Sequence, residues 1–317
     1  MKTMIKRRAF LKKSAAAGAF SVLGLAMPAG AFFTVLKKVP DIAVAKGKNY
    51  FLSAQKAVNL LGGMKSMIKP GQKVGLLINS DFTQLGAFVN PDIPLAVIDL
   101  CNEAGAREIV CLQKVKDEYW KRSRFYEEMQ EQVAEVKHVE ANVFPAKFSE
   151  EHYKMVEKIA GARKLENVEV IREIDNCDVF INIPIAKHHP TTLYTGAIKN
   201  MMGLTTRKTN VHMHLGSGVK NDPEFLGQCL ADINLYRRPD LVVVDATEFI
   251  ISNGPAGPGE LKKPDTVVAG RDIVAVDALC ATYLDYSPYD ITAIIKAHEA
   301  GLGKIDYLSL NIKEIFV

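Results

Sequence analysis

Short apolar runs alternate with longer amphipathic stretches along the chain from about residue 50 onward. An uninterrupted apolar run is typical of a strand that is buried on both faces of a parallel sheet. Such runs predict strands at residues 74–78, 108–112, 168–171, 178–183, 241–244 and 266–269. Apolar residues that recur at helical spacing predict helices instead. The helices expected on this basis lie at residues 50–67, 94–104, 119–136, 149–160, 192–202, 223–236, 273–284 and 291–300.

The alternation of strands and helices indicates the α/β class. We therefore expect a mainly parallel, Rossmann-like sheet with flanking helices. Residues 44–317 are assigned to this α/β domain, and the pattern leaves open whether the domain has one lobe or two.

The N-terminus has a different pattern, in which basic residues precede an uncharged apolar stretch. Residues 1–31 contain the pair Arg7 and Arg8, followed by Phe-Leu-Lys, and they end in the small residues 29–31. This order is that of a secretory signal peptide. The paired arginines resemble a twin-arginine export signal. Residues 32–43 are then expected to be a tether.

A twin-arginine signal implies the twin-arginine (Tat) translocon as a partner during export. It places the protein in the periplasm or on the outer face of the cytoplasmic membrane. The alternative is an uncleaved membrane anchor, although the apolar stretch is shorter than the roughly 20 residues that a spanning helix needs.

Charge and cysteine content exclude several classes of function. The chain has 40 basic and 36 acidic residues; six of the basic ones lie in the signal, which leaves 34 basic against 36 acidic residues. This balance gives no electrostatic reason to expect nucleic-acid binding. None of the five cysteines forms a CxxC pair, so an iron–sulfur cluster is not expected, and their pairing stays open.

Polar residues follow three of the predicted strands. Ligands of open α/β sheets bind at the carboxyl ends of strands. The first such end carries Asn79, and the third carries Asp245, which is followed by a Gly/Pro loop. The second and densest end carries Lys187 and His189 and leads into a predicted helix with Lys199. The sequence therefore predicts a site where these ends meet.

This site has the chemistry of an anion-binding centre. Lys187 and Lys199 would bind a carboxylate or phosphate, together with the free N–H groups of a helix N-terminus. His189 would act as a general acid or base, or as a metal ligand. Asn200 would be an orienting donor and Asp245 a charge partner. The residues that we expect to approach a bound cofactor are Asn79, Thr195, Gly196, Asn253, Gly254 and Gly257.

A second pattern suggests a divalent metal. If the segment containing His212 and His214 is extended, both rings lie on one face. His189 could then be the third ligand. The alternative is that these histidines are solvated.

Several segments resemble family 362 of the domains of unknown function. The resemblance rests on Lys187, His189, the run Thr-Gly-Ala-Ile-Lys-Asn at 195–200 and the run Gly-Arg-Asp-Ile-Val-Ala-Val-Asp at 270–277. It implies no settled activity. Many members carry ferredoxin-like segments, which this chain lacks. A more distant likeness to nickel-pincer lactate racemases is taken as analogy only.

These observations leave two functions open. The first is an exported enzyme that acts on a small anionic substrate through a Lys/His site, with or without help from a metal. The second is a non-catalytic module that binds a metal or cofactor and serves a redox partner in the cell envelope.

Overall fold

The centre of the structure is an eight-stranded sheet with the order β14-β1-β13-β10-β7-β2-β3-β4. This computed structural model describes residues 39–141 and 147–317, so the predicted signal and most of the predicted tether lie outside the described residues. The described residues from Val39 to Val317 form one compact unit. The strands are β1 (Ile42–Lys46), β2 (Lys73–Ile78), β3 (Glu108–Cys111), β4 (Lys137–His138), β7 (Val179–Ile183), β10 (Leu241–Ala246), β13 (Thr266–Gly270) and β14 (Ile312–Phe316).

The sheet is mainly parallel, which confirms the predicted fold class. Strands β10, β7, β2, β3 and β4 run parallel to one another, whereas β13 is antiparallel to both β10 and β1. From β2 the chain first builds outward through β3 and β4, and it then returns to place β7 and β10 on the other side of β2. The strand order therefore reverses between β2 and β7, the position at which such sheets bind ligands.

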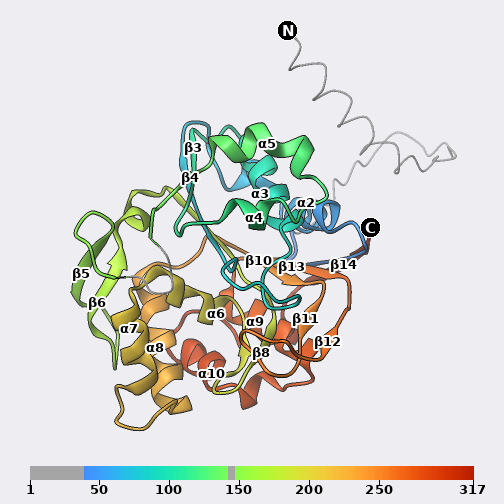
Figure 1. The fold of residues 1–317 in the computed structure, drawn as a ribbon. Helices are drawn as coiled ribbons and strands as arrows, with labels where there is room; N and C mark the ends of the chain where they lie inside the picture. Colours follow the sequence, from blue (N-terminus) through green and yellow to red (C-terminus); the bar gives the residue numbers. More distant parts are fainter. Residues whose placement is uncertain (1–38, 142–146) are drawn as a thin grey trace, which may run out of the picture. The chain divides into compact units, whose positions relative to one another are not determined.

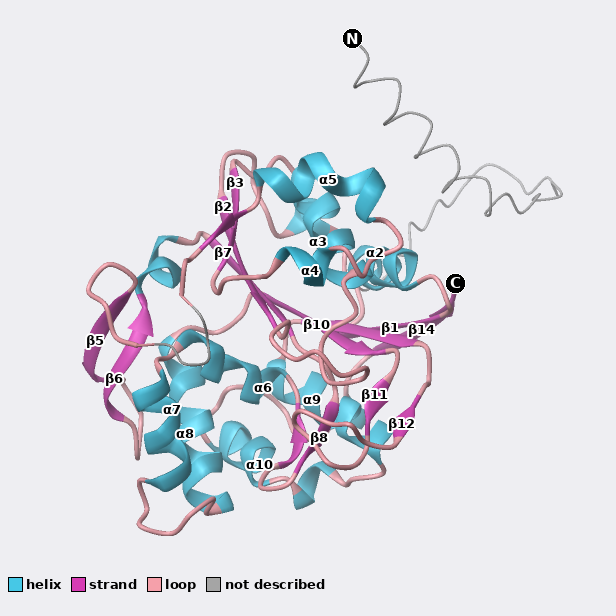
Figure 2. Ribbon diagram, in the orientation of Figure 1, coloured by secondary structure: helices cyan, strands magenta, loops and turns pink. Residues whose placement is uncertain are grey.

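Helices cover both faces of the sheet (Figures 1 and 2). One layer contains α2 (Tyr50–Leu60), α3 (Asp92–Glu103), the short α4 (Asp117–Trp120) and α5 (Tyr126–Glu135). On the other face, α6 (Ala197–Asn200) and α9 (Ile273–Ala281) contact the sheet directly. The helices α8 (Pro223–Tyr236) and α10 (Thr292–Glu299) pack on them. No helix of the described residues is long and apolar enough to cross a membrane.

Two predicted helices are wrong in whole or in part. The segment 149–160 contains β5 (Tyr153–Lys158), which pairs antiparallel with β6 (Glu166–Ile171). The segment 192–202 begins with β9 (Leu193–Thr195), and its helix α6 starts only at Ala197. In both places pairing with a neighbouring strand overrides local helical preference.

Some elements were not predicted. The edge strand β14 and its neighbour β1 have five residues each, and β1 begins at Ile42, within the segment assigned to the tether. The helix α7 (Arg207–Leu215) is polar over much of its length. A small β11 (Phe249–Ile250) and β12 (Leu261–Lys262) pair antiparallel at the two ends of the Gly/Pro loop.

Candidate functional site

A hairpin beyond the end of β7 carries the densest group of polar residues. Its strands are β8 (Lys187–His189) and β9 (Leu193–Thr195), with Lys187 opposite Thr195, His188 opposite Tyr194 and His189 opposite Leu193. Side chains alternate between the faces of a strand. Lys187, His189 and Thr195 therefore share one face, and His188 and Tyr194 share the other.

Lys187 is a fully buried cation. Its side chain has no exposed surface, its Nζ donates to the carbonyl oxygen of Ala87, and it lies 3.9 Å from the ring centroid of Phe82. Among the described residues it forms no ion pair with a carboxylate. Burial, and then the charge of Lys199, hold the pKa of Lys187 well below its usual range.

Lys199 belongs to α6 and is half-buried. The partner of its Nζ is the weak acceptor Sδ of Met202, at 3.7 Å. Burial lowers the pKa of Lys199 to about 8. Its charge in turn lowers the pKa values of Lys187, His189 and His214, so these four groups form one cationic cluster.

His189 is buried and held in one tautomer. Its Nδ1 accepts hydrogen bonds from the backbone N–H groups of Thr191 and Thr192, at 3.2 and 3.3 Å. Burial, followed by the charges of Lys199 and the other members of the cluster, lowers its pKa to about 2. The ring is therefore neutral with its proton on Nε2, and it offers the site a hydrogen-bond donor.

The predicted metal triad does not assemble. Because α7 is helical rather than extended, residues two positions apart point to different sides. His214 lies beside His189, with ring centroids 6.2 Å apart, whereas exposed His212 packs edge-on against Phe225. Among the described residues, no three His, Cys, Asp or Glu side chains are grouped so that they could hold a metal ion.

Asn79 and Asn200 belong to a chain of side-chain amides. The Nδ2 of Asn200 donates to the Oδ1 of Asn182 at 2.7 Å and to the Leu77 carbonyl at 3.2 Å. The Nδ2 of Asn79 lies 3.4 Å from the Oδ1 of Asn200. Asn182 donates to the Ala197 carbonyl at 2.9 Å. The chain thus ties α6 to the ends of β2 and β7, and it already uses the donors of Asn200.

Asp245 is buried but is not paired with Lys187. Its carboxylate accepts from the backbone N–H of Asn90 at 2.6 Å and from both the N–H and the hydroxyl of Thr247. Burial raises its pKa to about 6. These contacts join the end of β10 to the loop after β2. The same loop contributes the Ala87 carbonyl that accepts from Lys187. Asp245 therefore helps to position the loop that contacts this lysine.

The sequence analysis missed the role of Asp277 on α9. Its carboxylate accepts from the backbone N–H groups of Ala197 and Ile198, at 2.7 and 2.8 Å, and from the Tyr194 hydroxyl at 3.2 Å. It therefore caps α6 and fixes the start of the helix that carries Lys199. A Cβ atom at Gly196 would lie 2.4 Å from the Asp277 carboxylate, so Gly196 allows this close approach.

The Gly/Pro loop lies against the other face of the hairpin. The N–H of Gly254 donates to Nδ1 of His188 at 3.1 Å, and a Cβ at Gly254 would lie 1.8 Å from the His188 carbonyl. Asn253 donates to the Pro258 carbonyl within the loop, whereas Gly257 adopts a positive φ. The contacts of Gly254 hold His188 on the hairpin face opposite Lys187 and His189. Thr195 differs, because its buried hydroxyl has no hydrogen-bond partner among the described residues.

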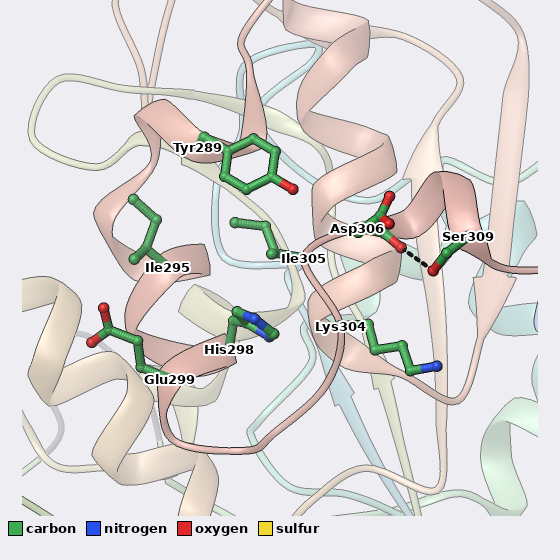
Figure 3. A pocket seen from close by; sticks show the side chains of 8 residues that line it. All are labelled: Tyr289, Ile295, His298, Glu299, Lys304, Ile305, Asp306 and Ser309. Atoms are coloured by element: carbon green, nitrogen blue, oxygen red, sulfur yellow. Dashed lines mark hydrogen bonds between the residues drawn. The ribbon is translucent and has the colours of Figure 1, made fainter.

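Two cavities lie away from the cluster. One, of about 570 Å³, is lined by residues from α10 and from the segments before and after it, including Tyr289, His298 and Ile305 (Figure 3). The other, of about 420 Å³, lies around the ion pairs of Lys73 and Glu108. Neither contains a predicted site residue. The cationic cluster is therefore singled out by its chemistry rather than by the size of a cavity.

The reversed strand order and the polar residues at the carboxyl ends of β2, β7 and β10 define a doubly wound α/β protein with its candidate site at that edge of the sheet. The chain belongs to the family described as Domain of unknown function (DUF362), whose model matches residues 73–282. This match confirms the resemblance found in the sequence.

Individual relatives are distant. A thylakoid-associated protein of Synechocystis sp. is 22% identical over 273 residues, which cover 84% of this chain and 81% of that protein. The lactate racemase apoprotein of Thermoanaerobacterium thermosaccharolyticum has a TM-score of 0.45 and 11% identity, over 74% of this chain and 57% of that one. A Thermotoga maritima protein has a TM-score of 0.44 and 10% identity, over 80% of this chain and 60% of that one. The chain thus spans less than two thirds of either solved structure.

Proposed function

We propose that this protein binds a small anion, a carboxylate or a phosphate, at the cluster of Lys187, Lys199 and His189, and acts on it as an exported enzyme. The observation that carries the proposal is that buried Lys187 and half-buried Lys199 have no carboxylate partner among the described residues. Substrate turnover and export are parts of the proposal.

An unpaired buried cation is costly, and proteins ordinarily pair it or neutralise it. In this protein no neighbouring carboxylate offsets the cost, because none contributes to the pKa shift of either lysine. A bound anion would supply the missing negative charge. Binding would then raise the pKa of Lys187 and return this lysine to its charged form.

Neutral donors on the same hairpin face add to this chemistry. His189 holds its Nε2–H free because Nδ1 already accepts two backbone bonds. The unpartnered hydroxyl of Thr195 lies directly across the hairpin from Lys187. A buried hydroxyl without a partner costs about 1–3 kcal/mol, which a ligand oxygen would recover.

The cellular location rests on the N-terminal sequence. The charged start, the apolar stretch and the small residues at 29–31 support export by the twin-arginine route. On this proposal the anion is a molecule of the periplasm or of the outer face of the cytoplasmic membrane.

The test is calorimetric titration of the full chain with phosphate and, separately, with acetate. Lys187→Met keeps the length and the burial of the side chain but removes its charge. We expect this variant to lose at least about tenfold in affinity, because a charge-assisted hydrogen bond is worth roughly 1.5–3 kcal/mol.

Lys208→Met is the matched control. Lys208 lies on α7, where its exposed ammonium pairs with Glu169 at 3.0 Å, outside the cluster. This variant should bind as the unaltered protein does. Failure of both anions to bind, or equal binding by Lys187→Met, would overturn the proposal.

A further inference from the structure

Lys199 lacks the partners that an ammonium group normally has. A lysine ammonium can donate three hydrogen bonds. Among the described residues, the Nζ of Lys199 has only the thioether of Met202, at 3.7 Å, and it takes part in no ion pair. As a whole residue Lys199 is half-buried, whereas Lys187 has no exposed surface.

The surroundings of this amine offer no free negative charge among the described residues. Lys187, His189 and His214 all lie within its electrostatic reach, and the Asp277 carboxylate is already used by the start of α6. A desolvated lysine is activated as a nucleophile, because a larger fraction of it is neutral. Burial lowers the pKa of Lys199 to about 8.

The position of the amine is also fixed. Asp277 holds the first residues of α6, and the amide of Asn200 ties the end of that helix to β7. The helix cannot shift without breaking these bonds. A catalytic group gains from being held in place before its substrate arrives.

We propose that Lys199 is an amine nucleophile that forms an imine with a small anionic aldehyde or ketone, whose anionic group is bound by Lys187 and Thr195. This inference rests on the proposed anion site and names the class of substrate for it. The two lysines then have different roles. Lys187, charged in the complex, holds the anion, and Lys199 reacts in its neutral form, which burial favours.

The covalent step is balanced without any further reactant. The lone pair of Nζ forms a bond to the carbonyl carbon, and the carbonyl π electrons move to the oxygen. The two protons of the amine pass to that oxygen, the carbon–oxygen bond breaks and water leaves. The neutral Nε2–H of His189 is available to stabilise the developing charge on the oxygen.

The test is reductive trapping on the full chain. The protein is treated at pH 7.5 with a low concentration of glyoxylate, an anionic aldehyde, and with cyanoborohydride, which reduces an imine to a stable N-carboxymethyl-lysine. Peptide mass spectrometry then measures the labelling rate of each lysine. We expect Lys199 to react at least about tenfold faster than exposed Lys208, because an ordinary lysine is almost wholly protonated at this pH.

Two comparisons identify the role of the anion. Acetaldehyde, which carries no charge, should show a smaller preference for Lys199 than glyoxylate does. Lys187→Met should remove the preference for glyoxylate, and Lys208→Arg should leave the labelling of Lys199 unchanged.

The outcomes separate this inference from the proposed function. If phosphate or acetate binds but Lys199 is labelled no faster than Lys208, the imine is overturned and the anion site remains. If neither anion binds and no lysine is labelled preferentially, both proposals fail.

Discussion

At the scale of single residues, the sequence was informative about chemistry and less so about roles. Lys187, His189 and Lys199 were predicted to meet, and the structure places their charges within reach of one another. Their hydrogen-bond partners could not be foreseen. The tautomer of His189 depends on two backbone N–H groups in the hairpin turn, and a sequence pattern does not specify such geometry.

The depressed pKa of Lys199 predicts how stability depends on pH. Its pKa is about 8 in the folded protein against 10.5 in the unfolded chain, so between these values the unfolded chain binds more protons. The free energy of unfolding contributed by this group therefore rises with pH over that window. We expect Lys199→Met to flatten this rise in urea titrations at pH 7.5, 9 and 10.5.

The exposed Lys208→Met variant is the reference for this measurement, since it removes one lysine outside the cluster. A stability curve for Lys199→Met with the same slope as that of Lys208→Met would show that Lys199 is not perturbed.

At the scale of elements, long apolar strands were predicted well, and polar segments were not. Strand β10 and helix α8 agree with the sequence pattern because burial dictates their residues. Helix α7 was not predicted, and β5 was predicted to be helical, because their mixed residues carry little periodicity. The role of Asp277 was missed for another reason, since it lies 80 residues from its partner Ala197.

The start of α6 yields a stability prediction. Gly196→Ala should lower the free energy of unfolding by about 1–3 kcal/mol, because the added methyl group would overlap the Tyr194 hydroxyl and the Asp277 carboxylate. Urea titration measures the change. In an Asp277→Ala background the same substitution should cost less, because one of the two obstructing groups is gone. An equal cost in both backgrounds would contradict this account of Gly196.

At the scale of the whole molecule, the candidate site lies where the strand order reverses, between β2 and β7. The hairpin, α6 and the loop after β2 all converge on the carboxyl ends of β2 and β7. The alternation of strands and helices allowed the α/β class to be predicted. The strand order could not be read from the sequence, because it depends on which strands pair across long separations.

The proposed export is tested separately, on the whole chain. Replacing both Arg7 and Arg8 with Lys should keep the protein in the cytoplasm, because the arginine pair is the feature of the signal that the twin-arginine route requires. Cell fractionation followed by immunoblotting measures the distribution. Unchanged export of the double variant would contradict the assignment of the signal.

The central claim is that Lys187 and Lys199, which have no carboxylate partner among the described residues, bind a small anion. The most direct measurement is calorimetric titration of the full chain with sulfate at pH 8, in two buffers of different ionisation enthalpy, since sulfate itself does not titrate near this pH. Our account predicts binding with net uptake of protons by the protein, as the anion raises the pKa of Lys187. Absence of binding, or binding without proton uptake, would contradict it.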